Sequence, residues 1–539
     1  MNYKHILLLF ILLSLGCRQN QQPVENKDAW YKHLLIYNLD VKTFKDSDGD
    51  GEGDFNGLTE KLSYLQSLGV NTIWLAPFQP SPLQDDGYDI IDYLGIDPKL
   101  GGLSGFKKFM AAAKVRHIKV IMDIVLNHSS DKHPWFKAGI EDTTSTKHDW
   151  YVWAAKKPND WDKGMGFPGV EKETWRYQPT ARQYYFHRFY KFQPDLNYQN
   201  PRVIEEAKHI LAYWLDQGMD GFRLDAVPFI IDDPRTDSEN PKFDFNILHQ
   251  LSLFVKKHKP DALLLGEANV KPDENQQYFG KQNGLEMMFN FYANQYLFYG
   301  LATGDVKKFS EALNKTSVKP ATAQWAWFLR NHDEIDLGRL SKEQINDVYK
   351  RMGPDTTMQL YKRGIRRRLA TMLNGDIQRL KMAYSLLYSL PGTPVIRSGE
   401  EIGMGDDLKL KERLAIRTPM QWDTSANGGF TTGKPFRPVI NTVMYGYKKL
   451  NVAAQRKDDQ SLLNFITNII KQRKAFPEIT NGVWKTLNGG QHVLIMEYSN
   501  KVKTVITLHN FSEKPQSVTL PGDTKVSLKG YGFTWLRLR

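Results

Sequence analysis

Short apolar runs alternate with segments of helical periodicity over most of the chain. Runs of four to six apolar residues between turn signals are typical of buried strands. One helical stripe is formed by Leu58, Leu62, Leu65 and Leu68, and another pattern runs from Ile204 to Trp214 and ends at Gly218. The apolar runs fall at residues 34–37, 72–76, 120–125, 221–224, 263–266, 287–291, 325–329 and 394–396. Eight strands alternating with helices predict a closed (β/α)₈ TIM barrel of the α/β class.

Two regions depart from this alternation. Residues 129–193 are rich in Trp, Lys, Gly and Pro and follow the third predicted strand, so we expect a subdomain inserted over the active face of the barrel. From about residue 480, alternating runs at 493–498, 504–508 and 532–536 predict a C-terminal antiparallel β-domain. We expect the helix carrying Leu462, Ile466 and Ile470 to lead into it. The predicted units are barrel at 30–128 and 194–455, insert at 129–193, and helix with β-domain at 456–539.

The N-terminus has the pattern of a targeting segment. The apolar run from Ile6 to Leu15 is too short to span a bilayer, and residues 18–29 form a polar linker. Cys17, the sole cysteine of the sequence, follows Gly16 in an arrangement that resembles the acylation site of a bacterial lipoprotein, although Ser14 and Leu15 depart from the usual order. We expect a signal peptide over residues 1–17 and export, with a lipid anchor as the one membrane contact, on the periplasmic or outer side. The alternative is an ordinary cleaved signal peptide.

Composition and charge add little about the substrate. The chain has 539 residues, 41% of them hydrophobic, which is enough for a large core with smaller domains attached. The formal net charge is +12, but the basic residues are scattered and no nucleic-acid motif is present, so we expect no nucleic-acid partner. The densest basic run, residues 364–369, is expected to form the polar side of a helix that continues into Leu373.

Carboxylates follow several of the predicted strands. The segments at 123–128, 221–226, 266–269 and 330–334 each end an apolar run in acidic, His or Arg residues. The carboxyl ends of barrel strands meet at one face, so Asp225, Glu267 and Asp333 are expected to lie together. Paired carboxylates in such a place are what the cleavage of a glycosidic bond requires.

The neighbours of these carboxylates suggest different tasks for them. Arg223 precedes Asp225 by two residues on one strand face, where it can orient that carboxylate and hold it ionised, as suits a nucleophile. Glu267 follows a fully apolar run, where desolvation tends to raise the pKa and suits a general acid/base. Asp333 can bind sugar hydroxyls, and His128 and His332 can add hydrogen bonds.

The four segments together resemble the motifs of glycoside hydrolase family 13, the α-amylase family. The resemblance implies that Asp225 is the nucleophile, Glu267 the acid/base and Asp333 the transition-state stabiliser, with Arg223, His128 and His332 on the substrate side. The segment 193–198, Gln-Pro-Asp-Leu-Asn-Tyr, resembles the oligo-1,6-glucosidase and trehalose synthase branch.

The same resemblance implies a closed sugar pocket. Tyr88 and Asp89 match residues that stack on and hydrogen-bond the terminal glucose, and Arg417 matches an arginine that can pair with Asp89 and close the pocket. The segments 395–400 and 411–416 depart from the family pattern near the region where substrate specificity would be set.

Acidic residues alternate with glycines at positions 46–54, in the manner of a loop that wraps a hard divalent cation. By resemblance, Asp46, Asp48, Asp50, the backbone of Glu52, and Asp54 would bind structural Ca²⁺, or Mg²⁺. The alternative is a solvated acidic turn. A second site that uses Asn127 and Asp232 is a further expectation from the resemblance.

The sequence thus predicts a retaining, exo-acting enzyme on maltose and short α-glucans, with a covalent glucosyl–Asp225 intermediate. Hydrolysis of the α-glucosidase type is the first expectation, and isomerisation of maltose to trehalose is the alternative. An inactive sugar-binding lipoprotein on the same fold is the alternative from another class, and the intact set of Asp225, Glu267 and Asp333 argues against it.

Overall fold

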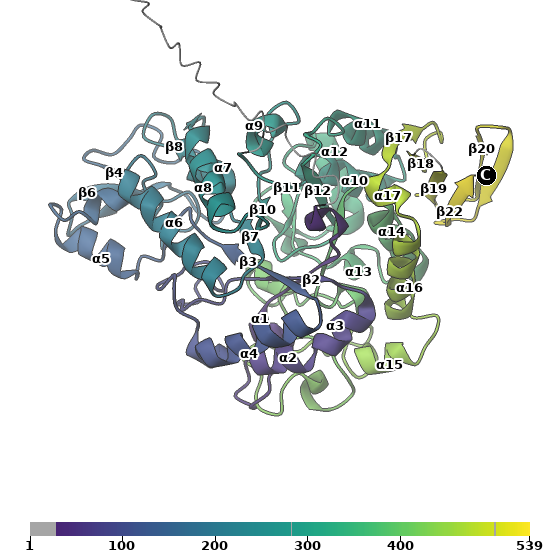
Figure 1. Ribbon diagram of the computed structural model, residues 1–539, viewed down its shortest axis with the longest axis horizontal. Coiled ribbons are helices and arrows are strands. Elements are labelled where there is room, and N and C mark those ends of the chain that lie inside the picture. The colour runs from purple at the N-terminus through teal and green to yellow at the C-terminus, as the bar shows by residue number, and fades with distance from the viewer. Residues whose placement is uncertain (1–28, 282, 501–502, 539) are drawn as a thin grey trace, which may run out of the picture.

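A closed barrel of eight parallel strands forms the centre of the molecule (Figure 1). The computed structural model describes residues 29–281, 283–500 and 503–538. The strands follow one another around the barrel in the order β1-β16-β12-β11-β10-β7-β3-β2. They are β1 (Ile36–Leu39), β2 (Thr72–Leu75), β3 (Lys119–Ile124), β7 (Gly221–Leu224), β10 (Leu263–Gly266), β11 (Met287–Phe289), β12 (Gln324–Phe328) and β16 (Thr393–Arg397). Each predicted strand is present, so the predicted (β/α)₈ barrel is confirmed.

Helices surround the barrel and bury their apolar stripes against it. The longest, α6, starts where the Asn200 side chain accepts the backbone N–H of Arg202, with Pro201 in the first turn. The predicted leucine stripe is divided at Lys61 between two helices, α2 and α3. The barrel helices are α1 (Val41–Phe44), α2 (Phe55–Glu60), α3 (Leu62–Leu68), α4 (Gly102–Val115), α6 (Pro201–Asp216), α8 (Phe245–His258), α10 (Phe291–Thr303), α11 (Lys307–Lys315), α12 (Lys342–Met352) and α14 (Ile377–Ser389).

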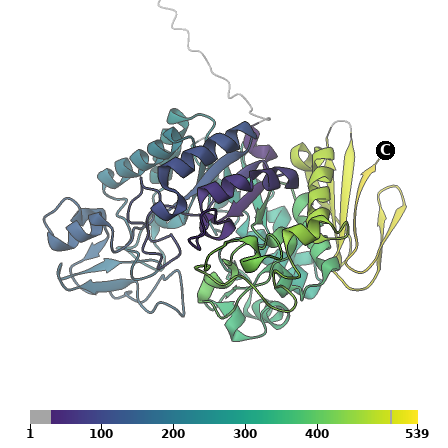
Figure 2. The same cartoon turned by 90° about the horizontal axis from the view of Figure 1, so that it is seen from below.

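The segment after β3 folds into a small unit at one end of the molecule (Figure 2). It contains helix α5 (Pro134–Glu141) and a three-stranded sheet in the order β4-β6-β5, from Trp153–Ala154, Gln183–Phe186 and Trp175–Gln178. Trp175 and Phe186 pack in a core of their own. The chain returns to the barrel where His128 bridges to Asp195. We call residues 129–193 the insert.

The C-terminal strands lie at the opposite end of the molecule (Figures 1 and 2). One sheet here has four antiparallel strands, β17 (Val483–Leu487), β18 (Val493–Ser499), β19 (Thr504–Asn510) and β22 (Phe533–Leu538). A separate hairpin, β20 (Gln516–Leu520) and β21 (Thr524–Leu528), lies between β19 and β22 in the sequence. Helix α16 (Leu462–Ala475) packs on α14 and α3. It also contacts the C-terminal sheet, where Phe465 packs on Phe533 with ring centroids 5.6 Å apart and the Ala475 carbonyl accepts from Arg537 at 3.0 Å. This helix therefore lies between the barrel and the β-domain that it was predicted to lead into.

The basic run at residues 364–369 does not have the predicted helical form. Gly364 and Ile365 are strand β15, and the helix α13 begins only at Leu369. Arg366 donates to the carbonyl oxygens of residues 408, 410 and 412, and the buried Arg368 pairs with Glu400 at 3.1 Å. Because loop carbonyls and a buried carboxylate need donors, these arginines point inward and not to solvent.

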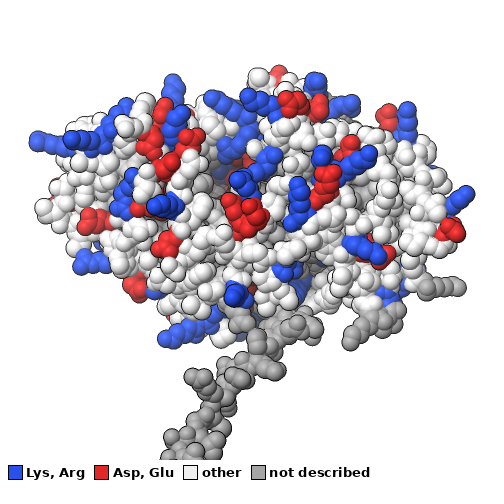
Figure 3. Space-filling model, turned by 90° about the horizontal axis from the view of Figure 1, so that it is seen from above, with Lys and Arg blue, Asp and Glu red and all other residues white. Residues whose placement is uncertain are grey.

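The remaining surface charge is mixed. Basic and acidic side chains alternate over the face drawn in Figure 3 and form no field of a single sign. Among the described residues, no helix is long and apolar enough to cross a membrane.

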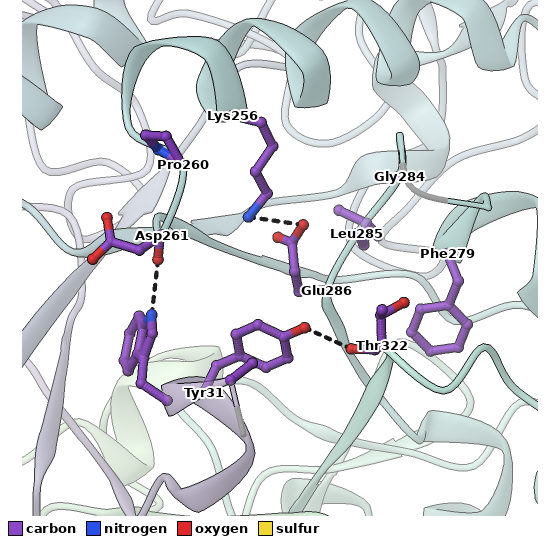
Figure 4. Close-up of a pocket in the computed structure, with 11 residues that line it drawn as sticks. Tyr31, Lys256, Pro260, Asp261, Phe279, Gly284, Leu285, Glu286 and Thr322 are labelled. Atoms are coloured by element: carbon purple, nitrogen blue, oxygen red, sulfur yellow. Dashed lines mark hydrogen bonds and ion pairs between the residues drawn. The ribbon is translucent and has the colours of Figure 1, made fainter. Parts of the chain in front are cut away.

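A cavity of about 520 Å³ opens at the N-terminal end of the barrel (Figure 4). Its polar groups bind one another: Lys256 pairs with Glu286 at 3.0 Å, and the Tyr31 hydroxyl donates to the carbonyl of Thr322 at 2.7 Å. The Trp30 indole donates to the carbonyl of Asp261 at 2.8 Å. The bonds of Trp30 and Tyr31 hold the short helix η1 (Trp30–His33) against this end of the barrel.

Candidate active site

A pocket of about 510 Å³ lies at the C-terminal end of the barrel. Asp225, Glu267 and Asp333 each directly follow, or lie a few residues beyond, the end of a strand, and all three line this pocket. Tyr88 and His128 line it too. The structure therefore brings together the three carboxylates that the sequence singled out.

One guanidinium group joins the acids at the base of the pocket. Arg223, on β7, is buried, with its side chain 1% exposed. Its Nη1 lies 2.7 Å from Asp123 Oδ1 and also contacts Asp225 Oδ1, while Nη2 lies 2.8 Å from Glu267 Oε2. Three carboxylates thus share one cation, an arrangement that orders Asp225 and Glu267 relative to each other.

The backbone after Asp225 helps to hold Glu267. Ala226 adopts the left-handed conformation, with φ 50° and ψ 40°. Its N–H donates to Glu267 Oε2 at 3.0 Å. A non-glycine residue in this region costs about 1–3 kcal/mol and persists where the surroundings fix it, often at functional sites.

Burial perturbs both carboxyl groups in the same direction. It raises the pKa of Glu267 to about 7 and that of Asp225 to about 6, although Arg223 opposes both shifts. The sequence suggested that Arg223 would keep Asp225 ionised without such a shift, but one guanidinium divided among three acids does not outweigh their desolvation. The pKa of Glu267 is thus raised the further of the two, in the direction that keeps a general acid protonated.

Asp333 is held ionised by its neighbours. Its Oδ2 lies 3.0 Å from His332 Nε2, and its Oδ1 accepts from Arg413 at 2.8 Å and from Arg417 at 3.1 Å. Burial alone would raise the pKa of Asp333, but the charges of Arg413 and Arg417 and a hydrogen bond with His332 hold the pKa of that carboxyl well below its usual range. Burial in turn lowers the pKa of His332 to about 3, so this ring is neutral.

Tyr88 connects the aromatic side of the pocket to the buried acids. Its hydroxyl donates to Asp123 Oδ2 at 2.9 Å and lies 2.5 Å from His332 Nε2, and its ring stacks on that of His332 with centroids 5.4 Å apart. His128 Nε2 lies 3.1 Å from the Tyr88 carbonyl. Asp123 and His332 therefore fix the ring of Tyr88, and His128 holds its backbone.

Asp89 does not have the predicted position. Its carboxylate accepts the hydroxyl of Ser81 and the N–H groups of Gln84 and Asp85, so it closes a local turn and does not line the pocket. Arg417 does not pair with Asp89; it lies 3.3 Å from Asp86 Oδ2. The prediction for Asp89 and for its pairing with Arg417 is wrong.

Asp85 and Arg413 occupy the place predicted for that pair. Asp85 Oδ1 accepts from Arg413 and its Oδ2 accepts from Gln193 at 3.0 Å, and both Asp85 and Arg413 line the pocket. The sequence offered one indication of Asp85 as a pocket residue, namely that it lies three residues before Tyr88. Arg413 gave no signal of its own, because it lies in the segment 411–416 that departs from the family pattern.

The acidic loop brings together part of its predicted ligand set. Asp46, Asp48 and Asp50 each offer an oxygen, and these oxygens lie within 4.8 Å of one another. Asp54 instead caps helix α2 through the N–H of Gly57, and the Glu52 side chain pairs with Lys99. Three carboxylates at this spacing fit the donor set of a hard divalent cation.

The residues proposed for a second cation site bind other side chains of the protein. Asp232 pairs with Arg188 at 2.7 Å, and the Asn127 amide lies 3.2 Å from Asp195. These contacts give no support to a site shared by Asn127 and Asp232. The Cys17 prediction lies outside the described residues.

The structure thus places several carboxylates together at the C-terminal face of a barrel, and paired carboxylates are the groups that cleavage of a glycosidic bond requires. The α-amylase catalytic-domain model matches residues 39–366 and 339–482 of the chain. The chain belongs to the α-amylase family, glycoside hydrolase family 13, and is an enzyme of that family.

Relatives and solved structures agree with this assignment. The trehalose synthase/amylase TreS of Mycobacterium tuberculosis is 38% identical over 91% of this chain and 84% of its own length. The trehalose synthase of Pimelobacter is 37% identical over 94% and 96%, and the oligo-1,6-glucosidase of Heyndrickxia coagulans 31% over 93% and 95%. The trehalulose synthase MutB of Pseudomonas mesoacidophila superposes with a TM-score of 0.78 at 26% identity, over 95% of this chain and 99% of that one.

Proposed function

We propose that this protein is a retaining, exo-acting α-glucosyl enzyme that converts maltose to trehalose. The observation that carries the retaining mechanism is Arg223, which binds Asp225 and Glu267 through its two terminal nitrogens. Carboxylates joined in this way support a separation of about 5–5.5 Å, which belongs to retaining enzymes. The pKa order of the two groups, with Glu267 above Asp225, supports Glu267 as the acid.

In the first step, Asp225 attacks the anomeric carbon of the non-reducing glucose and forms a glucosyl ester. Glu267 gives its proton to the glycosidic oxygen, which leaves as O4–H of the second glucose. Asp333, ionised beside Arg413 and Arg417, would accept the hydroxyls of the bound ring and stabilise its positive charge.

In the second step, Glu267 is the base. It removes a proton from the 1-hydroxyl of the retained glucose, whose oxygen attacks the anomeric carbon of the glucosyl ester. The bond from that carbon to Asp225 breaks, the carboxylate is released and trehalose forms. If water takes the place of that hydroxyl, two glucose molecules result. Isomerisation therefore depends on keeping the first product in the pocket and water out of it.

A closed end of the pocket supports exo action. Arg413 joins Asp85 to Asp333 and lies over the ring of Phe167 from the insert, 4.7 Å from its centroid. Tyr190 of the insert and Tyr361 both donate to Glu412, the residue before Arg413. These contacts leave one glucose site behind the scissile bond and join the insert to the rest of the pocket.

The identities favour isomerisation over hydrolysis, because trehalose synthases match at 37–38% and oligo-1,6-glucosidases at 30–31%. Hydrolysis of maltose and short α-glucans, the first expectation from the sequence, is the second candidate. The match to the oligo-1,6-glucosidase of Heyndrickxia coagulans, 31% identical over 93% of this chain, supports it.

Product analysis with maltose tests the proposal. Purified protein is incubated with maltose, and the sugars are separated over time. Trehalose that forms before an equivalent amount of glucose supports isomerisation, and glucose alone supports hydrolysis. Absence of both products, with maltose still bound in calorimetry, would contradict catalysis and leave a sugar-binding protein.

We also propose that Asp46, Asp48 and Asp50 hold a structural Ca²⁺, with Mg²⁺ as the other candidate, and that the protein is exported and anchored through a lipid on Cys17. The three carboxylates within 4.8 Å support the cation. The Gly16–Cys17 pair after an apolar run supports the anchor.

A further inference from the structure

Asp336 is a half-buried carboxylate in the pocket wall with no part in the chemistry above. It ends the short strand β13 (Ile335–Asp336), and its side chain is 15% exposed. It lines the pocket beside Asn269, Arg339 and Arg363. Asn269 follows Glu267 by two residues, so this wall lies on the side from which the acid would meet the leaving group.

Both carboxylate oxygens of Asp336 are used. Oδ2 accepts the side-chain amide of Asn269. Oδ1 accepts Nε of Arg363 at 2.9 Å and the N–H of Gly338 at 3.1 Å. An ionised carboxylate with about four acceptor positions can hold several donors in fixed directions, which a neutral side chain of the same size cannot do.

The segment after β10 is thereby held from two directions. Asp336 binds the side chain of Asn269, and Arg339 Nη2 donates to the Asn269 carbonyl at 2.6 Å. Asp336 also orients Arg363, whose Nη2 donates to the carbonyl of Gly166 in the insert at 3.0 Å. One carboxylate therefore contacts both the segment that carries Glu267 and the arginine that reaches the insert.

We propose that Asp336 is a positioning residue for Glu267. By holding Asn269, it fixes the segment that places the Glu267 carboxyl at the glycosidic oxygen. The inference rests on the proposed acid role of Glu267. Displacement of a catalytic group by about 1 Å costs about 10²-fold in rate. A leaving group that departs without a proton does not need the acid, so the loss depends on the leaving group.

The test uses Asp336→Asn, which keeps the size of the side chain but turns one acceptor into a donor. Its kcat and KM are measured on maltose, on 4-nitrophenyl α-glucoside and on α-glucosyl fluoride. We expect kcat/KM to fall about 10²-fold on maltose, less on the aryl glucoside and least on the fluoride. An equal loss on all three substrates would overturn the inference.

Three further variants make the result specific. Asn269→Ala should give the same dependence on the leaving group, and the double variant should be no worse than either single one, because both remove one interaction. If Asp336→Asn does not fold, the single variant Asn269→Ala provides the test in its place. Arg363→Gln breaks the bond to Gly166 but keeps the Asn269 contact, so its loss should be equal for all leaving groups.

Glu267→Gln separates this inference from the proposed function. If its loss is independent of the leaving group, the acid role of Glu267 is wrong. If its loss follows the leaving group and that of Asp336→Asn does not, only the positioning role is wrong.

Discussion

Asp85 and Arg413 are separated by 328 positions in the sequence, and Nη2 of Arg413 donates to Oδ1 of Asp85 at 2.5 Å. The same guanidinium donates through Nη1 to Asp333 at 2.8 Å. This arginine joins the loop after β2 to the loop after β12 and encloses the end of the sugar pocket.

Replacement of Arg413 by lysine should weaken substrate binding. An ammonium group keeps the charge but cannot bridge Asp85 and Asp333 with the geometry of a planar fork. We expect kcat/KM on maltose to fall by about 10- to 100-fold, with most of the change in KM, because one buried charged contact is worth about 2–5 kcal/mol when it is broken and less when it is weakened. The measurement is steady-state kinetics of Arg413→Lys, with Lys411→Gln, a substitution of an exposed neighbour, as the control. A change in kcat alone would contradict this role.

Asp225→Asn and Glu267→Gln should remove turnover without unfolding the protein. Asn cannot form the glucosyl ester, and Gln cannot supply a proton, which costs about 10²–10⁴-fold. NMR of the anomers released from an aryl α-glucoside checks the mechanism in the native protein, where the α-anomer should appear first. An initial β-anomer would refute retention.

The pH dependence of kcat/KM should be bell-shaped, with limbs near pH 6 and pH 7. The nucleophile must be ionised, so activity is lost as the pH falls through the raised pKa of Asp225, about 6. The acid must be protonated, so activity is also lost as the pH rises through the raised pKa of Glu267, about 7. The alkaline limb should be missing for α-glucosyl fluoride. A limb that persists there would assign it to another group.

Removal of the Ca²⁺ proposed for Asp46, Asp48 and Asp50 should lower thermal stability and leave the catalytic carboxylates unchanged. Chelation releases an ion that binds the folded loop through oxygens at about 2.3–2.6 Å, so the melting temperature should fall and recover when Ca²⁺ is added back. Asp48→Asn should remove this response. Glu60→Gln, an exposed acid in the helix that follows the loop, is the matched control and should keep it.

Fatty-acid labelling checks the anchor. Cells that express the full chain should incorporate labelled palmitate into it, and Cys17→Ser should not be labelled. Cys17 is the one thiol in the sequence, so no other cysteine can take the label. Equal labelling of the two proteins would exclude acylation at this position.

Local patterns predicted the barrel and its acids because the strands are buried runs that end in carboxylates. Asp225 and Glu267 follow β7 and β10 directly, so the strand positions also placed them together. The contacts that loop residues make could not be predicted from strand positions in this way. Asp89 lies in a turn that contains left-handed residues at Leu83 and Asp86, and this turn directs its carboxylate to backbone N–H groups.

The pairing of Asp85 with Arg413 depends on the tertiary approach of two loops, which no periodicity encodes. The arginines at 366–368 show the same limit. A basic run is read as a solvated surface, but here unpaired loop carbonyls and Glu400 provide partners inside the protein. The helix α16 contacts the barrel helices α14 and α3 as well as the C-terminal sheet, so its apolar stripe alone does not assign it to one unit.

The sharing of Arg223 by Asp123, Asp225 and Glu267 makes these acids a single thermodynamic unit. Neutralising one of them leaves the guanidinium to the other two, so their proton affinities fall together. A variant that lacks one carboxylate therefore differs from the native site by more than the missing group. Its remaining acids titrate at new values, and an inactive variant used to trap a sugar would hold that sugar in an altered field.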